Sequence, residues 1–95
     1  METVEIENVG RPGKTYRVDA AKFAAMREAY LAALPGEGPG LAPAEVLDRL
    51  GPRLPAHLFP GGATAGWWAK AVQLDLEAKG VVRRVPKGPV RLWLA

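Results

Sequence analysis

The chain has 95 residues, which is enough for one hydrophobic core and too few for two. It contains no cysteine and a single histidine, so neither disulfide bonds nor a zinc site can stabilise the fold, and apolar packing must do so. The net charge of +3 is unevenly distributed: residues 1–69 carry seven basic and eight acidic side chains, whereas residues 70–95 carry six basic and two acidic ones. A basic tail suits an anionic partner, although short hairpins often carry solvated arginine and lysine.

The first thirty residues contain no apolar run like that of a signal peptide. The longest uncharged stretch, residues 54–69, is interrupted by prolines and glycines and is too short to span a bilayer. We therefore expect a cytoplasmic protein with no membrane segment.

The N-terminal residues alternate between apolar and polar side chains with the period of a strand. Val4 and Ile6 are separated by a glutamate, and the alternation resumes after turn residues at 10–13. Residues 3–18 are therefore predicted to form a β-hairpin. Asp19 is a suitable N-cap for a following helix, because its side chain can accept a hydrogen bond from a free backbone N–H.

Three helices are predicted from the spacing of the apolar residues. The first spans residues 20–34, where apolar side chains recur at helical spacing on an alanine-rich background. A connector rich in proline and glycine ends it, and a second helix follows over residues 43–50. The third is expected over residues 64–79, with Thr64 as N-cap and Gly80 as the left-handed residue that follows the helix.

The same periodicity predicts which side chains face the core. They are Phe23, Met26, Tyr30 and Leu34 in the first helix, Val46, Leu47 and Leu50 in the second, and Ala65, Trp68, Ala69, Val72 and Leu76 in the third. Between the second and third helices, residues 52–62 are too rich in proline for a long helix, and we expect an ordered, irregular turn packed on the core. After the third helix, residues 81–85 and 90–94 are predicted to form two strands joined by a four-residue loop.

The order helix, helix, turn, helix, basic hairpin is that of a winged helix-turn-helix domain. Residues 72–84 (VQLDLEAKGVVRR) resemble the end of a recognition helix that enters its wing in bacterial winged-helix regulators. The whole chain also resembles a family of small bacterial proteins that share LFPGG (58–62), AGWW (65–68) and the segment 72–80. That resemblance implies a winged-helix fold and no established activity.

We therefore expect one α+β domain over residues 1–95: a winged helix-turn-helix with three helices, an N-terminal β-hairpin and a C-terminal β-hairpin wing over residues 81–94. The first functional interpretation is nucleic-acid binding, with duplex DNA as the partner. The start of the third helix would approach a groove, and the wing would hold phosphates. The side chains expected to take part are Thr64, Trp67 and Lys70 of the third helix and Arg83, Arg84, Lys87 and Arg91 of the wing.

The third helix departs from that of a typical DNA reader. Its outward face carries Trp67, Ala71 and Leu74, where polar or basic side chains normally meet base edges. Either the N-terminal hairpin or the proline-rich turn covers this face, or the face contacts a partner, for which a second copy of the chain is the first candidate. The alternative interpretation is therefore a protein-interaction or homodimerisation module with a winged-helix shape.

No pattern in the sequence points to catalysis. Residues 13–15 (GKT) resemble the end of a phosphate-binding P-loop, but Asn8 stands where that motif needs a glycine, and a strand is predicted to follow instead of a helix. The chain has no serine or cysteine to act as a nucleophile. Asp75 and Glu77 are two residues apart on a helix and point in different directions. We expect a protein that is not an enzyme and has neither a cofactor nor a bound metal.

Overall fold

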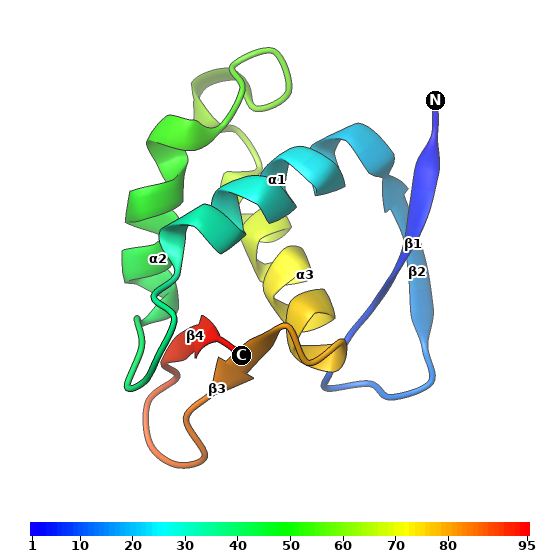
Figure 1. The fold of residues 1–95 in the computed structure, drawn as a ribbon. Helices are drawn as coiled ribbons and strands as arrows, with labels where there is room; N and C mark the ends of the chain where they lie inside the picture. Colours follow the sequence, from blue (N-terminus) through cyan, green and yellow to red (C-terminus); the bar gives the residue numbers. More distant parts are fainter.

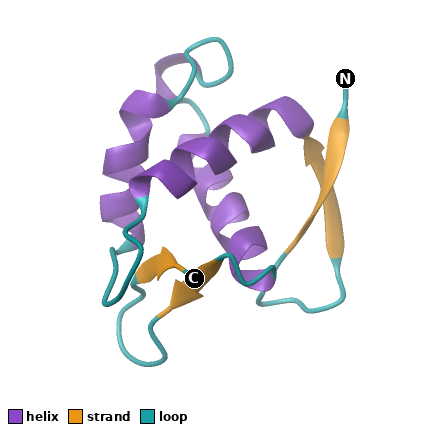
Figure 2. Cartoon of the chain, in the orientation of Figure 1, coloured by secondary structure: helices purple, strands orange, loops and turns teal.

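Three helices and two separate antiparallel hairpins make up the computed structural model, which describes residues 1–95 as an α+β fold (Figure 1). In chain order the elements are β1 (Thr3–Glu7), β2 (Thr15–Asp19), α1 (Ala20–Ala33), α2 (Pro43–Leu50), the 3₁₀ turns η1 (Gly51–Arg53) and η2 (Pro60–Gly62), α3 (Ala65–Ala78), β3 (Val82–Arg84) and β4 (Leu92–Leu94). Figure 2 shows the two hairpins apart from each other, on different sides of the helices. None of the three helices has the length and apolar character needed to cross a membrane.

The N-terminal hairpin, β1 and β2, has one apolar and one polar face. Val4 pairs with Val18 and Ile6 pairs with Tyr16, so these four side chains share the face that turns toward the helices. The hairpin extends one residue beyond its predicted end, to Asp19. The Asp19 carboxylate accepts a hydrogen bond from the backbone N–H of Lys22 at 3.1 Å and so caps α1, as expected.

The predicted core face of α1 is confirmed, since Phe23, Met26, Tyr30 and Leu34 are all buried. The helix ends at Ala33, one residue earlier than predicted. Leu34 has extended backbone angles (φ −88°, ψ 142°) because the ring of a following proline disfavours the helical conformation.

The core face of α2 follows the prediction only in part. Val46 and Leu50 are fully buried and Leu47 is half-buried. The proline-rich segment after α2 is ordered against the core, as expected: Phe59 is buried, and Leu54 and Leu58 pack on the core cluster.

Thr64 occupies the N-cap position of α3, as predicted, but its side chain makes no capping hydrogen bond. Its backbone is left-handed (φ 61°), and its hydroxyl donates to the carbonyl oxygen of Ala63 at 2.6 Å instead of accepting an N–H of the helix. A left-handed backbone is unusual for a β-branched residue. The predicted core face of α3 is confirmed, because Ala65, Trp68, Ala69, Val72 and Leu76 are buried.

The C-terminal hairpin, β3 and β4, is shorter than predicted, with three residues in each strand. The loop prolines Pro86 and Pro89 have no N–H to donate to a strand ladder, which limits its length. Leu41, between α1 and α2, pairs with Leu92 of β4 through two backbone hydrogen bonds of 2.9 and 2.8 Å. Gly40 approaches β4 closely in a left-handed conformation (φ 82°).

Candidate binding groove

The N-terminal hairpin is fixed to the C-terminal half of α3 by a buried carboxylate. Asp75 is fully buried, and its Oδ1 accepts the backbone N–H of Glu7 at 2.8 Å. Its Oδ2 accepts from Nζ of Lys79 at 2.9 Å. Beside it, the backbone N–H of Val9 donates to the carbonyl oxygen of Leu74 at 3.2 Å. The hairpin is therefore held against α3 by directional contacts as well as by apolar packing.

A groove of about 420 Å³ runs between the docked hairpin and α3. Its apolar lining comes from both elements: Ile6, Tyr16 and Val18 of the hairpin, and Trp67, Ala71 and Leu74 of α3. The three α3 residues are those predicted to form its outward apolar face. The groove therefore includes the apolar face of α3 for which the sequence did not show what covers it.

Trp67 is the most exposed aromatic side chain in this groove, with 60% of its surface accessible, and Tyr16 follows with 38%. The ring of Trp67 meets the buried Trp68 edge to face, with centroids 5.1 Å apart and planes at 80°. Edge-to-face contact is one of the two arrangements that aromatic pairs prefer, and it contributes roughly 0.5–1.5 kcal/mol. The Trp67 indole is therefore held in place while much of its surface faces solvent.

The hairpin covers only part of the outward face of α3. Ala71 and Leu74 are half-buried in the wall beneath it, whereas Trp67 stays exposed nearer the start of the helix. The proline-rich turn takes no part in the lining. Of the two covers considered for this face, the structure therefore shows the N-terminal hairpin, and it leaves Trp67 open.

Lys70 supplies a free positive charge at the groove. It lies three residues after Trp67 on the same side of α3, is exposed and forms no ion pair. Arg17 also borders the groove, but its guanidinium pairs with Glu5 at 3.3 Å. Lys70 is consequently the cation best placed to meet an anionic ligand there.

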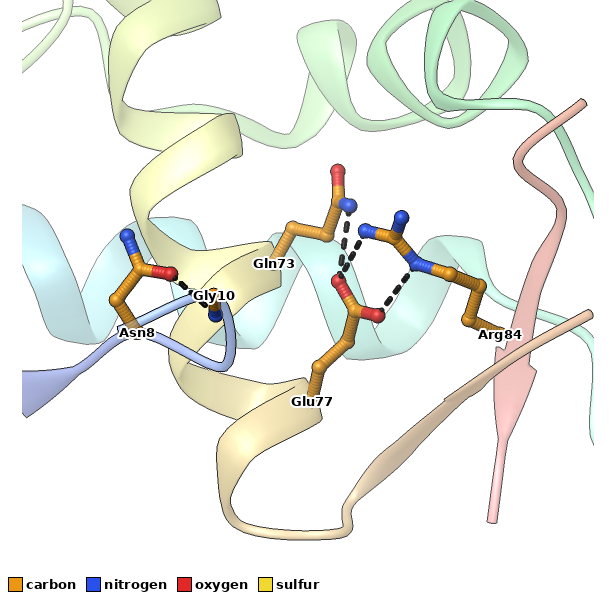
Figure 3. A network of polar contacts seen from close by, with 5 residues as sticks. All are labelled: Asn8, Gly10, Gln73, Glu77 and Arg84. Carbon is orange, nitrogen blue, oxygen red and sulfur yellow. Dashed lines mark hydrogen bonds and ion pairs between the residues drawn. The ribbon is translucent and has the colours of Figure 1, made fainter. Parts of the chain in front are cut away.

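Arg84, predicted to hold phosphate, is occupied inside the molecule. Its Nε and Nη2 donate to the two carboxylate oxygens of Glu77 at 2.7 and 2.9 Å, and Nε2 of Gln73 donates to the same carboxylate at 3.0 Å (Figure 3). The hydrogen bonds to Glu77 raise the pKa of Arg84 above its ordinary value. This pair joins the C-terminal hairpin to α3 and neutralises the Arg84 charge.

The same carboxylate influences a buried phenol. Burial raises the pKa of Tyr30, and the negative charge of Glu77 raises it further, while Arg84 offsets part of the effect. Tyr30 therefore remains neutral well into the alkaline range.

The other predicted phosphate contacts are exposed and form no ion pair. Arg83 lies opposite Trp93 in the strand register, on the face of the C-terminal hairpin away from Arg84, because side chains alternate along a strand. Arg91 donates to the carbonyl oxygen of Gly40 at 3.3 Å, and Lys87 lies in the loop between the strands. The structure therefore places Trp67 and Lys70 at one groove and leaves Thr64 outside its lining. It does not bring all the basic residues of this hairpin onto one face.

The sequence patterns did not assign the hairpin wall of the groove, which includes Tyr16, and did not predict the burial of Asp75. Tyr16 is predictable as a strand residue, but no local signal places it opposite Trp67. A charged residue between the apolar stripes of a helix is normally exposed, and Asp75 is buried only because Glu7 and Lys79 supply donors.

The fold and the groove define a small α+β domain with a preformed apolar site, and no group of acidic, histidine or cysteine side chains is arranged to hold a metal ion. The family profile described as "Family of unknown function (DUF6958)" matches residues 3–92. The chain therefore belongs to this family, which agrees with the expected membership of a small family without an established activity. No curated protein and no solved structure matches the chain.

Proposed function

We propose that this chain is a winged-helix domain that binds nucleic acid through its phosphates, without reading base sequence. The connections of the chain support the winged-helix part of the proposal. A winged helix places a short strand between its first two helices and adds it to the sheet of the wing. Leu41, between α1 and α2, pairs with Leu92 of β4 in this manner, and β3 and β4 follow α3 as a wing would.

The observation that carries the proposal is the free N-terminal half of α3, where Trp67 and Lys70 are both exposed. Recognition helices contact nucleic acid mainly through their N-terminal residues. The N-terminal hairpin is bonded to the other half of α3, near Leu74 and Asp75, and so leaves this part accessible. The overall charge of +3 favours an anionic partner.

The cations without an ion pair would supply most of the binding energy. Among the residues predicted to contact nucleic acid, they are Lys70, Arg83, Lys87 and Arg91. If all four meet phosphates, the slope of log K against log salt concentration would be about −3.6 on duplex DNA and about −2.8 on a single strand. Arg84 is left out because Glu77 neutralises it.

Fluorescence anisotropy of labelled oligonucleotides tests the proposal. The chain is titrated into each oligonucleotide at salt concentrations between about 50 and 300 mM, roughly the range over which phosphate contacts weaken. Lys70→Ala and Lys87→Ala should each weaken binding to all sequences alike and make the slope shallower by about 1. Arg27→Ala removes an exposed charge from α1 and should change the affinity by less than about twofold. A flat salt response, or no binding at the lowest salt, contradicts the proposal.

Self-association is a second candidate function, favoured by the exposure of Trp67. Tryptophan is enriched among the residues that dominate protein interfaces, and this one borders an apolar groove. Under this proposal the molar mass measured by light scattering rises with concentration, and Trp67→Ala returns it to that of the monomer while the circular dichroism spectrum is unchanged. A monomeric mass at every concentration rules this candidate out.

A further inference from the structure

We propose that the groove between the N-terminal hairpin and α3 holds one unpaired nucleobase, stacked on Trp67, so that the chain prefers single-stranded to double-stranded nucleic acid. This inference rests on the nucleic-acid binding proposed above and names the class of ligand that the groove takes.

The size of the groove fits a single base. A cavity of about 150 Å³ holds one benzene ring, so a groove of about 420 Å³ has room for a base and part of its sugar. The hairpin forms the second wall and is fixed to α3 by the Glu7–Asp75 and Val9–Leu74 hydrogen bonds. A duplex would have to displace this wall, whereas a base turned out of a flexible strand would not.

The chemistry of the α3 wall favours the face of a base over its edge. The side chains of Ala71 and Leu74 carry no hydrogen-bond donor or acceptor, so they cannot read base edges in a major groove. Every base has a π-face, however, and stacks on an exposed aromatic side chain whatever its sequence. Tyr16 offers a second aromatic surface from the hairpin wall.

The position of Trp67 is set before a ligand arrives. Its edge-to-face contact with the buried Trp68 fixes the indole at 5.1 Å from that ring. A side chain that is already ordered loses little conformational entropy on binding. Trp67 is therefore suited to act as a stacking surface, and its large exposure is compatible with a folded, stable domain.

Charge complementarity favours a nucleotide over an uncharged apolar segment. Lys70 lies one helical turn from Trp67 and is free to meet the phosphate of a stacked nucleotide. Glu7 is the one acidic residue in the lining, against Lys70 and Arg17, so the formal charge of the lining stays positive. Asn8, which also lines the groove, accepts the N–H of Gly10 at 2.8 Å through Oδ1, so its amide nitrogen forms no hydrogen bond within the chain (Figure 3).

The test compares a short oligodeoxythymidine strand with a duplex of equal length, using the full chain and two readouts, anisotropy and tryptophan fluorescence. The single strand should bind more tightly and quench the fluorescence, because Trp67 is exposed whereas Trp68 is buried. Trp67→Ala should weaken single-strand binding by about 10-fold or more and abolish most of the quenching. Trp67→Tyr keeps an aromatic face and should restore most of the affinity.

Trp93→Phe is the matched control, because Trp93 packs near Gly38 and not in the groove, and it should leave both the affinity and the quenching in place. If Trp67→Ala keeps its fold by circular dichroism and its full single-strand affinity, the inference is wrong while the phosphate-based function stands. If the wild-type chain binds neither nucleic acid, both fail. If Trp67→Ala lowers only self-association, the groove is a protein contact and the inference is wrong.

Discussion

The backbone N–H of Glu7 donates a 2.8 Å hydrogen bond to the carboxylate of Asp75, a fully buried side chain 68 residues further along the chain. The ammonium of Lys79 lies 2.8 Å from the same carboxylate oxygen and 2.9 Å from the other. One acidic side chain therefore joins a hairpin at the start of the fold to a helix near its end.

Asp75→Ala should lower the free energy of unfolding by about 2–4 kcal/mol, because it leaves a backbone N–H without an acceptor and Lys79 without its partner. Asp75→Asn should cost less, since the amide oxygen can still accept from Glu7. Urea denaturation measures both. Asp48 of α2 is exposed and forms no ion pair, so Asp48→Ala serves as the control and should stay within about 0.5 kcal/mol of wild type. Equal stability of Asp75→Ala and Asp48→Ala would show that the buried contact contributes nothing.

Gly40→Ala should destabilise the fold by about 3 kcal/mol or more, because a left-handed alanine is strained and its Cβ would collide with backbone. A Cβ at this position would lie 2.2 Å from the carbonyl oxygen of Leu92, and φ is +82°. Gly36→Ala is the matched control, since a Cβ there meets no atom within 4 Å. Thermal unfolding distinguishes the two variants, and a melting temperature for Gly40→Ala as high as that for Gly36→Ala is incompatible with the close approach to β4.

The raised pKa of Tyr30 predicts a loss of stability in alkaline solution. The unfolded chain releases the phenol proton near pH 10 and the folded chain only at higher pH, so stability is complete below about pH 10 and falls above it, by up to about 1.4 kcal/mol per pH unit from this group. Tyr30→Phe keeps the buried ring and removes this contribution. Urea denaturation of both proteins measures this contribution to the free energy of unfolding at pH 8 and pH 11, roughly 2 units below and 1 unit above the ordinary pKa of tyrosine. An equal loss of stability between pH 8 and pH 11 in the wild type and in Tyr30→Phe would argue against a raised pKa of Tyr30.

Thr64→Gly should raise the free energy of unfolding by up to about 1 kcal/mol. The left-handed backbone at Thr64 (φ 61°) costs on the order of 1–3 kcal/mol for a residue with a side chain, and the extra freedom of an unfolded glycine offsets part of the gain. Thr15→Gly, in the extended strand β2, should have the opposite sign and lose roughly 0.5–1 kcal/mol. A loss of stability in Thr64→Gly would contradict the strain inferred at this position.

The helices are predictable because the spacing of their apolar residues shows which face is buried. Phe23, Met26 and Tyr30 of α1 follow the helical repeat and are all buried. The burial of Gln73 and Asp75 is not predictable in this way, because a polar side chain is buried only where partners compensate for its lost water. Glu77 compensates Gln73 from the next turn, but the partner of Asp75 on β1 is 68 residues away and leaves no local pattern.

One wall of the candidate groove is likewise predictable from the sequence and the other is not. Trp67, Ala71 and Leu74 are recognisable from the sequence as one apolar face, since helical spacing alone groups them. The opposite wall is not recognisable, because the alternation of β1 and β2 shows which face of the hairpin is apolar without showing which element that face meets. The sequence also could not show that Arg84 is paired. A basic residue in a short strand is expected to be free to bind phosphate, but Arg84 bonds to Glu77.

The Glu7–Asp75 hydrogen bond also orders the events of folding. β1 and β2 leave the ribosome well before α3, and a two-stranded hairpin is marginally stable by itself in water. The hairpin therefore cannot dock on α3 until the chain has been synthesised at least as far as Asp75. A segment that is synthesised early thus depends on a later one for its packing, and the groove exists only once both elements are in place.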